Sequence, residues 1–315
     1  MRKGLIAPAV IVFLGLFVLG LALECRAQEV VWRVPTDFST IQAAIDSLVV
    51  LAGHTILVEP GNHAGAFVTK AVEIRGEDNA VINFGPAHGS GMIMGFRLLA
   101  GSDGASINHL IFEVDLAIMN GGAVNDVTVD HCTFKNSVQA VSNWRGSGWV
   151  ISHNDILDLR CKNGGGIGIL VADFNGGVVK DNLISHNKIS GTLHVDPQDG
   201  GGYSGTGIVL YADFRWGAAG TAGIHDNRIV KNKVSLVSDT PVVVDVMAFE
   251  LTDTRADPSV IPPVLFDNAI GFNDFRGTLL QVALSPEILD SYNNISRNLG
   301  ENRGHGAHPK AFLYD

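Results

Sequence analysis

The side chains best suited to chemistry in this sequence carry oxygen and recur at equivalent places of a repeated pattern: Asn120, Asn143, Asp173 and Asp213. In stacked parallel strands, successive members of such a column, here called the Asn/Asp ladder, would lie about 4.8 Å apart. Two carboxylates at that distance repel each other unless one is protonated or a cation lies between them, and Ca²⁺ prefers oxygen ligands. We therefore expect Asp173 and Asp213 to form a Ca²⁺ or acid–base site. The alternative is that both cap backbone groups at the turns that follow them.

Other candidate side chains flank this ladder. Arg145 or Arg215 could pair with a carboxylate or sulfate group on a sugar, although an ordinary surface role is the alternative. The stretches 193–203 and 216–223 lengthen the chain on either side of Asp213, and long loops beside a rigid scaffold commonly carry binding residues. The resulting assignment is Asp173, Asp213 and Arg215 for catalysis, with Asn143, Arg145, Tyr211, His194 and His225 for substrate binding.

The segments that carry these residues repeat along the chain. Three similar stretches occupy 141–146, 171–176 and 211–217, and a second shared phrase follows each of them at 152–156, 185–189 and 230–234. Self-similarity of this kind indicates one supersecondary unit stacked on itself. The spacing drifts from 33 residues to 45 between copies of the second phrase, and short strands joined by loops tolerate such drift better than helical repeats do.

Most of the remaining chain consists of short apolar runs separated by Gly and Asn. The exception is 40–50, where Ile41, Ala44, Ile45 and Leu48 fall on one helical face, so we expect a helix there that covers the open end of a strand array. The lack of further helical periodicity excludes alternating βα units and helix bundles.

Alternation along the repeated strands predicts which side chains lie inside. The residues expected to point inward are Leu170, Ala172, Phe174, Leu210, Ala212 and Phe214, and those expected to face solvent are Val171, Asp173, Tyr211 and Asp213. Asparagines recur where the chain must bend, at Asn154, Asn187, Asn232 and Asn273. Because Asn tolerates left-handed backbone and its amide can bond along a stack, we assign these asparagines a structural role.

The phrase at 38–46 followed by 55–61 resembles the start of pectin-methylesterase-like and other parallel β-helix proteins, and the His-Asn-x-Ile and Gly-Ile-x-Leu coils resemble those of the pectate-lyase-like superfamily. This resemblance implies an all-β fold: a single right-handed parallel β-helix with a capping helix at about 40–50, coils at about 55–298 and a tail at 299–315. The superfamily includes lyases, hydrolases, esterases, epimerases and non-catalytic proteins, so the fold alone does not assign the activity.

The first 27 residues resemble an export signal, with a basic start, a long apolar run and a plausible cleavage site at 25–27. Retention of this segment as an anchor is the alternative. Without it, 19 basic and 31 acidic residues remain, a net charge of −12 that disfavours nucleic acid and anionic membranes as partners. Only Cys132 and Cys161 would then remain, and the sequence leaves open whether they pair.

We therefore expect a secreted or periplasmic monomer that binds or cleaves a polysaccharide beside the Asn/Asp ladder, as a lyase or a hydrolase. A lyase would use Ca²⁺ to neutralise the substrate carboxylate and a base to remove the C5 proton, for which Lys162, Lys180 and Arg215 are the nearest candidates. Because the chain has an excess of acidic residues, the substrate should be either a polyuronate bound through a cation such as Ca²⁺ or a neutral glycan. The alternative function is a non-catalytic surface, adhesion or scaffold protein.

Overall fold

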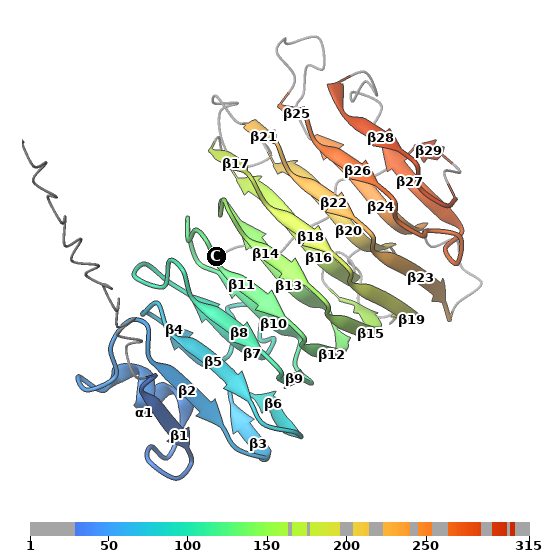
Figure 1. The fold of residues 1–315 in the computed structure, drawn as a ribbon. Coiled ribbons are helices and arrows are strands. Elements are labelled where there is room, and N and C mark those ends of the chain that lie inside the picture. The colour runs from blue at the N-terminus through green and yellow to red at the C-terminus, as the bar shows by residue number, and fades with distance from the viewer. Residues whose placement is uncertain are drawn as a thin grey trace, which may run out of the picture.

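The computed structural model describes residues 29–162, 166–174, 177–195, 204–213, 223–239, 245–253, 264–284, 292–300 and 303–305. In these segments the chain winds into a parallel β-helix, and successive turns add strands to three long sheets (Figure 1). Every pairing between named strands in the described segments is parallel. The predicted all-β solenoid is confirmed.

The sheets are named here by their strand numbers. The ten-stranded sheet contains β1 (Val31–Val34), β2 (Thr55–Val58), β5 (Glu73–Gly76), β8 (Ser106–Asn108), β11 (Thr128–Asp130), β14 (Val150–Ser152), β18 (Leu183–Ser185), β22 (Arg228–Val230), β26 (Ala269–Gly271) and β28 (Asn294–Ser296). The nine-stranded sheet contains β4 (Ala66–Val68), β7 (Met94–Leu98), β10 (Leu116–Asn120), β13 (Gln139–Trp144), β16 (Gly166–Phe174), β20 (Ser204–Asp213), β24 (Asp245–Asp253), β27 (Leu280–Leu284) and β29 (Arg303–His305). The seven-stranded sheet contains β3 (Gly61–Ala64), β6 (Ala80–Phe84), β9 (Ile111–Phe112), β12 (Thr133–Ser137), β15 (Asp155–Cys161), β19 (Lys188–Val195) and β23 (Lys233–Ser238). A short three-stranded sheet contains β17 (Val178–Lys180), β21 (Gly223–His225) and β25 (Leu265–Phe266).

The N-terminal helix α1 (Ile41–Asp46) lies between β1 and β2 in the chain. The Thr40 hydroxyl caps it by accepting a hydrogen bond of 3.0 Å from the backbone N–H of Ala43, and Ile41, Ala44 and Ile45 are fully buried. The helix is shorter than the predicted 40–50 because Ser47 already has extended backbone, which leaves Leu48 91% exposed. In the part of the chain that is described, no helix is long and apolar enough to cross a bilayer.

The strand array extends beyond its expected bounds of about 55–298. At the N-terminal end, β1 precedes residue 55 and pairs with β2. At the C-terminal end, β29 lies within the predicted tail and pairs with β27. The proposed export segment, 1–27, lies outside the described residues, as do 306–315.

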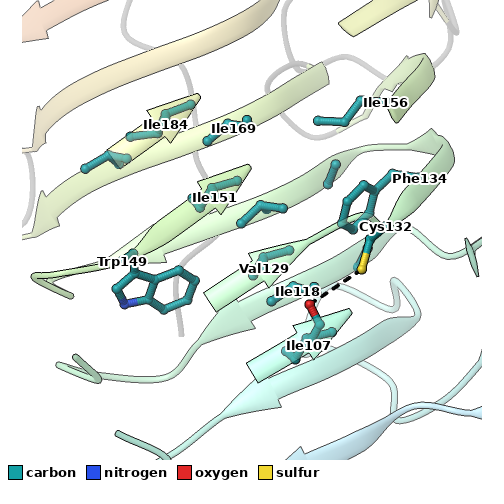
Figure 2. Packing of buried hydrophobic residues seen from close by; sticks show 14 of the residues in the cluster. Ile107, Ile118, Val129, Cys132, Phe134, Trp149, Ile151, Ile156, Ile169 and Ile184 are labelled. Carbon is teal, nitrogen blue, oxygen red and sulfur yellow. Dashed lines mark hydrogen bonds between the residues drawn. The ribbon is translucent and has the colours of Figure 1, made fainter. Parts of the chain in front are cut away.

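The core is built from columns of equivalent apolar side chains from successive coils (Figure 2). Ile107, Val129, Ile151 and Ile184 form one column across β8, β11, β14 and β18. In the seven-stranded sheet, the rings of Phe112 and Phe134 stack with centroids 5.1 Å apart. Burial of each such side chain stabilises the fold by roughly 1.5–3 kcal/mol. Because these side chains pack against their equivalents in the adjacent coils, each coil is stabilised chiefly by its neighbours.

Two buried columns of asparagines bridge the coils at their corners. In the first column each amide Nδ2 donates to the Oδ1 of the next residue at 2.9–3.0 Å, and the members are Asn154, Asn187, Asn232, Asn273 and Asn298. The second column has the same bonds at 2.8–2.9 Å between Asn182, Asn227, Asn268 and Asn293. These contacts support the structural role predicted for the repeated asparagines.

The left-handed residues at these corners precede asparagines of the columns, and the asparagines themselves are not left-handed. His153, His186 and Lys231 precede members of the first column with φ of 53°, 57° and 59°. Asp181 and Asp226 precede members of the second column with φ of 59° and 56°. Each asparagine therefore lies immediately after the bend, and its side chain forms the hydrogen bonds of the column without requiring a left-handed backbone.

Candidate functional site

The strand register divides the predicted Asn/Asp ladder. Asn143 on β13 pairs with Val171 on β16, two residues before Asp173. Asp173 pairs with Ala212 on β20, and Phe174 pairs with Asp213. Asp173 and Asp213 are therefore one register position apart on adjacent strands, whereas the repeated phrases align them directly.

This difference changes which side chains lie inside β16. The repeated phrases match at an offset of 40 residues, whereas Leu170 pairs with Val209, an offset of 39. A slip of one residue moves every side chain to the other face of a strand. Val171 and Leu210 belong to the common core, while Leu170 and Ala172 lie in a separate cluster with Trp144 and Tyr211. The inward prediction is correct for Leu210 and Ala212 and wrong for Leu170 and Ala172. The side chains of Phe174 and Phe214 lie outside the described set.

Three carboxylates stand at the carboxyl ends of three neighbouring strands: Asp173 on β16, Asp213 on β20 and Asp253 on β24. Asp173 and Asp253 share one register position, with Ala212 between them, and Asp213 is the next residue along β20. All three are buried, with exposed fractions of 1%, 1% and 4%. The prediction that Asp173 and Asp213 face solvent is therefore wrong. The third carboxylate, Asp253, was not predicted from the sequence.

Arg145 provides positive charge beside this group, with its Nε 3.8 Å from Oδ1 of Asp173. Its own backbone is left-handed, with φ of 61°, and its N–H donates to the carbonyl of Ala172 at 2.8 Å. The bend after β13 therefore directs this arginine toward the end of β16. The expected proximity of Arg145 and Asp173 is present in the structure.

The Ca²⁺ expected between Asp173 and Asp213 finds little support in this arrangement. The two residues differ in register, and a guanidinium rather than a free space lies next to Asp173. Within the described segments, three ligating side chains come together elsewhere, at Asp130, His131 and His153.

A fourth carboxylate, Glu250 on β24, is buried away from the common core. Its Oε2 accepts a hydrogen bond of 2.9 Å from the Thr206 hydroxyl, and its Oε1 accepts one of 2.6 Å from the Thr252 hydroxyl. Burial of a carboxylate is costly unless hydrogen bonds compensate, so these hydroxyls stabilise it. The polar residues Glu250 and Thr252 alternate with apolar Phe249 and Leu251, a pattern that could have revealed this face from the sequence.

Trp144 and Tyr211 support the same side of the nine-stranded sheet. Trp144 pairs with Ala172, and Ala172 with Tyr211, so the two rings belong to one column across β13, β16 and β20. Both side chains are fully buried and lie in one apolar cluster. Tyr211, expected on the solvent face as a substrate-binding residue, is instead packed within the protein.

The two asparagines of the predicted ladder hold backbone rather than face solvent. The Asn143 amide donates to Gly146 O at 2.9 Å and to Asn182 Oδ1 at 3.2 Å, and its Oδ1 accepts from the N–H of Gly146 at 2.8 Å. Asn120 bonds both the N–H and the carbonyl of Trp144. Both asparagines are completely buried.

The remaining predicted site residues lie on other sheets or outside the described chain. His194 is on β19 of the seven-stranded sheet, half-exposed, with Nδ1 3.0 Å from Asp239 Oδ2. His225 is on β21 of the three-stranded sheet, with Nδ1 2.7 Å from Asp226 Oδ2, and its ring stacks on Phe266 at 4.8 Å. Arg215 and most of the two loops beside Asp213 fall outside the described residues.

Two further features lie away from the carboxylates. A pocket of about 520 Å³ opens beside α1 and the start of the nine-stranded sheet, lined partly by Gln42 and Asp46. The side-chain Oε1 of Gln42 accepts a hydrogen bond of 2.7 Å from the backbone N–H of Phe67. Cys132 and Cys161 are both buried and are not joined by a disulfide, which answers the question of their pairing.

Comparison with known proteins assigns the fold family. The model of the right-handed beta helix region matches residues 71–245. A solved structure of the catalytic domain of a GH87 α-1,3-glucanase in complex with nigerose aligns with 14% identity and a TM-score of 0.32, covering 79% of this chain and 63% of that one. No curated protein matches the sequence. The family model, which spans more than half of the chain, carries the assignment.

Proposed function

Because this chain belongs to the right-handed beta helix family, we propose that it is a polysaccharide hydrolase whose catalytic carboxyl groups stand at the ends of β16 and β24. The observation that carries the proposal is that Asp173 and Asp253 occupy the same register position, and so the same face, at one edge of one sheet. Sugar hydrolysis requires a pair of carboxyl groups held at a set separation, and a rigid parallel sheet can supply one.

The register sets how far apart the three residues lie and which face each one occupies. Adjacent parallel strands are about 4.8 Å apart and each residue advances about 3.3 Å, so the backbone of Asp213 lies roughly 6 Å from that of Asp173 and of Asp253. The two outer residues are about 10 Å apart by the same spacing. Retaining enzymes hold their carboxyl groups about 5–5.5 Å apart and inverting enzymes about 6.5–9.5 Å. Asp213 is one register position away, so its side chain points to the opposite face of the sheet, and the pair that shares one face is Asp173 and Asp253, at a spacing close to that of inverting enzymes.

The chemistry needs one protonated and one ionised member of such a pair. The acid gives its proton to the glycosidic oxygen as that bond breaks, and the carboxylate either activates a water molecule or attacks the anomeric carbon before water completes hydrolysis. Arg145, 3.8 Å from Asp173, provides a counter-charge for an ionised carboxylate, so we assign Asp173 the role of base or nucleophile. Asp253, which shares the face of Asp173, is then the candidate acid.

A neutral glycan suits this site better than a polyuronate. The site gathers carboxylates, and residues 28–315 carry a net charge of −12, so an anionic substrate would be repelled. The lyase alternative needs a base to take the C5 proton, and among its three candidates only Lys162 and Lys180 lie in the described chain. Secretion or export to the periplasm, supported by the apolar segment at 1–27, forms part of the proposal, as does a monomeric state.

One observation favours a second candidate, the non-catalytic surface or scaffold protein. Many of the repeated polar side chains have structural roles at the corners of the coils. Asn120, Asn143 and the two asparagine columns form hydrogen bonds to the backbone or to one another. A protein built for rigidity alone would have the same corners. It would not require the carboxylates at the ends of β16, β20 and β24.

Release of reducing ends from a panel of neutral and acidic polysaccharides separates the two candidates. The proposal predicts soluble product from at least one neutral polysaccharide, and loss of that product in Asp253→Asn. Asp155→Asn is the matched control, because Asp155 is an exposed aspartate at the start of β15 on another sheet. Binding to a polysaccharide without any product would favour the non-catalytic candidate.

A further inference from the structure

A row of histidines lies on the outside of the β-helix, at the corner between the ten-stranded and seven-stranded sheets. His109, His131, His153 and His186 follow β8, β11, β14 and β18, and all four are exposed. Neighbouring rings stack with centroids 5.2, 4.9 and 4.9 Å apart and interplanar angles of 4°, 12° and 11°. These four side chains are called the histidine stack below.

The bend alone does not explain the choice of histidine. Each residue of the stack has left-handed backbone, with φ between 51° and 57°, and histidine is among the residues that tolerate this conformation. However, the next three coils place Lys231, Phe272 and Arg297 at the same corner with φ of 59°, 60° and 61°. Because the corner accepts other side chains, four consecutive imidazoles are a property of these coils in particular.

A carboxylate joins the middle of the stack. Asp130, the last residue of β11, has Oδ2 2.5 Å from Nδ1 of His131 and Oδ1 3.1 Å from Nδ1 of His153. The Ser152 hydroxyl donates to the same Oδ1 at 2.6 Å and fixes the carboxylate. Partial burial raises the pKa of Asp130, but the hydrogen bonds from Ser152, His131 and His153 outweigh it and hold that pKa below its usual value. The carboxylate is therefore ionised at neutral pH.

We propose that Asp130, His131 and His153 form a binding site for a divalent transition-metal ion of the Zn²⁺ or Ni²⁺ type. One ligand atom from each of the three residues lies within 4.8 Å of the others. Two imidazoles and a carboxylate form a ligand set suited to these metals, whereas Ca²⁺ and Mg²⁺ prefer oxygen alone.

Small side-chain rotations complete the site. Metal–nitrogen bonds of about 2.0–2.1 Å place neighbouring ligand atoms roughly 3.4 Å apart. The distances of 2.5 and 3.1 Å from the Asp130 oxygens to the ring nitrogens must therefore lengthen slightly, and the ligand atoms of the two histidines, within 4.8 Å of each other, must come closer. The rings of His131 and His153 are 52% and 48% exposed, so they can turn without disturbing the core. The ion would replace the protons in the hydrogen bonds between Asp130 and the two imidazoles, and water molecules would occupy its remaining coordination positions. Binding would link two successive coils from outside.

Calorimetric titration of the full chain with Zn²⁺, and separately with Ca²⁺, tests this site. We expect one Zn²⁺ per chain, no heat from Ca²⁺, and binding weakened about tenfold or more in His131→Asn and His153→Asn. Asparagine is chosen because it also tolerates left-handed backbone. His194→Asn is the matched control, since it removes another half-exposed histidine that is paired with an aspartate. Equal Zn²⁺ affinity in wild type and His131→Asn, or no binding by wild type, would overturn the proposal.

A measurement without substitutions guards against a variant that does not fold. Wild-type crystals soaked in Zn²⁺ should give an anomalous peak about 2.1 Å from the ring nitrogens of His131 and His153. A peak only at other residues, or none, would also overturn the proposal.

Discussion

Each asparagine of the corner columns supplies partners for backbone groups that a bend would otherwise leave unpaired. Asn187 illustrates this at the scale of one residue. Its Oδ1 accepts from both the backbone N–H and the amide of Asn154, and its Nδ2 donates to Ile151 O and to Asn232 Oδ1. A single side chain thus connects three coils, and its polar atoms are buried with all of these partners.

Asn187→Ala should destabilise the protein by at least 3 kcal/mol, because unsatisfied buried polar groups cost about 1–3 kcal/mol each and several would remain. Chemical denaturation measures this change. Asn62→Ala is the control, since Asn62 is an exposed asparagine in β3 and its replacement should change stability by no more than about 0.5 kcal/mol. Similar losses in both variants would show that the column is not a structural element.

The thiol of Cys132 gives the fold a dependence on alkaline pH. Burial raises its pKa to about 12 in the folded protein, whereas an unfolded cysteine ionises near 8.5. Above pH 9 the unfolded state therefore loses a proton that the folded state keeps, and stability falls as pH rises by about 1 kcal/mol per pH unit. Denaturation curves from pH 8 to 11 should show this slope in wild type and a flatter one in Cys132→Ala. An unchanged slope would contradict the assignment.

At the scale of strands, the sequence predicted the architecture well because each coil repeats the same apolar positions and turn residues. It predicted the site less well because two copies with nearly the same letters, LVADF at 170–174 and LYADF at 210–214, pair out of step. Local similarity aligns Asp173 with Asp213, whereas packing aligns Asp173 with Ala212 and then Asp253. Register depends on contacts between strands, and the loops between the copies hide it from a comparison of phrases.

Engineered disulfides can measure this register. Cysteines at Leu170 and Val209 should oxidise to a disulfide, because their Cα atoms are register partners about 4.8 Å apart, within the range a disulfide spans. Cysteines at Leu170 and Leu210, which match by sequence phrase, should not, because these side chains lie on opposite faces. Mass spectrometry of linked peptides distinguishes the two. A link only in the second pair would support an offset of 40 residues.

At the scale of the whole molecule, the β-helix is a stack in which each coil contacts mainly its neighbours, so its ends need cover. α1 packs against β1, β2 and β4 at the first end (Figure 1). The three carboxylates lie several coils away, where β16, β20 and β24 are flanked on both sides. Cap and candidate site should therefore respond independently to substitution.

Ile45→Ala should cost about 2–5 kcal/mol and weaken the first coils before the rest. Hydrogen exchange should show lost protection in β1 and β2, with β18 and β22 unchanged. Leu48→Ala, at a residue just beyond the helix that is 91% exposed, serves as the control. A uniform loss of protection along the stack would mean that the molecule unfolds as one unit.

The central claim is that the carboxyl groups of Asp173 and Asp253, at the ends of β16 and β24, perform hydrolysis. The most direct measurement is kcat/KM of Asp173→Asn, Asp213→Asn, Asp253→Asn and the control Asp155→Asn on a neutral polysaccharide that the wild type cleaves. The account predicts a loss of about 100-fold or more in Asp173→Asn and in Asp253→Asn, a smaller loss in Asp213→Asn, and an unchanged control, with folding retained in all variants. Activity within a few-fold of wild type in both Asp173→Asn and Asp253→Asn would contradict it.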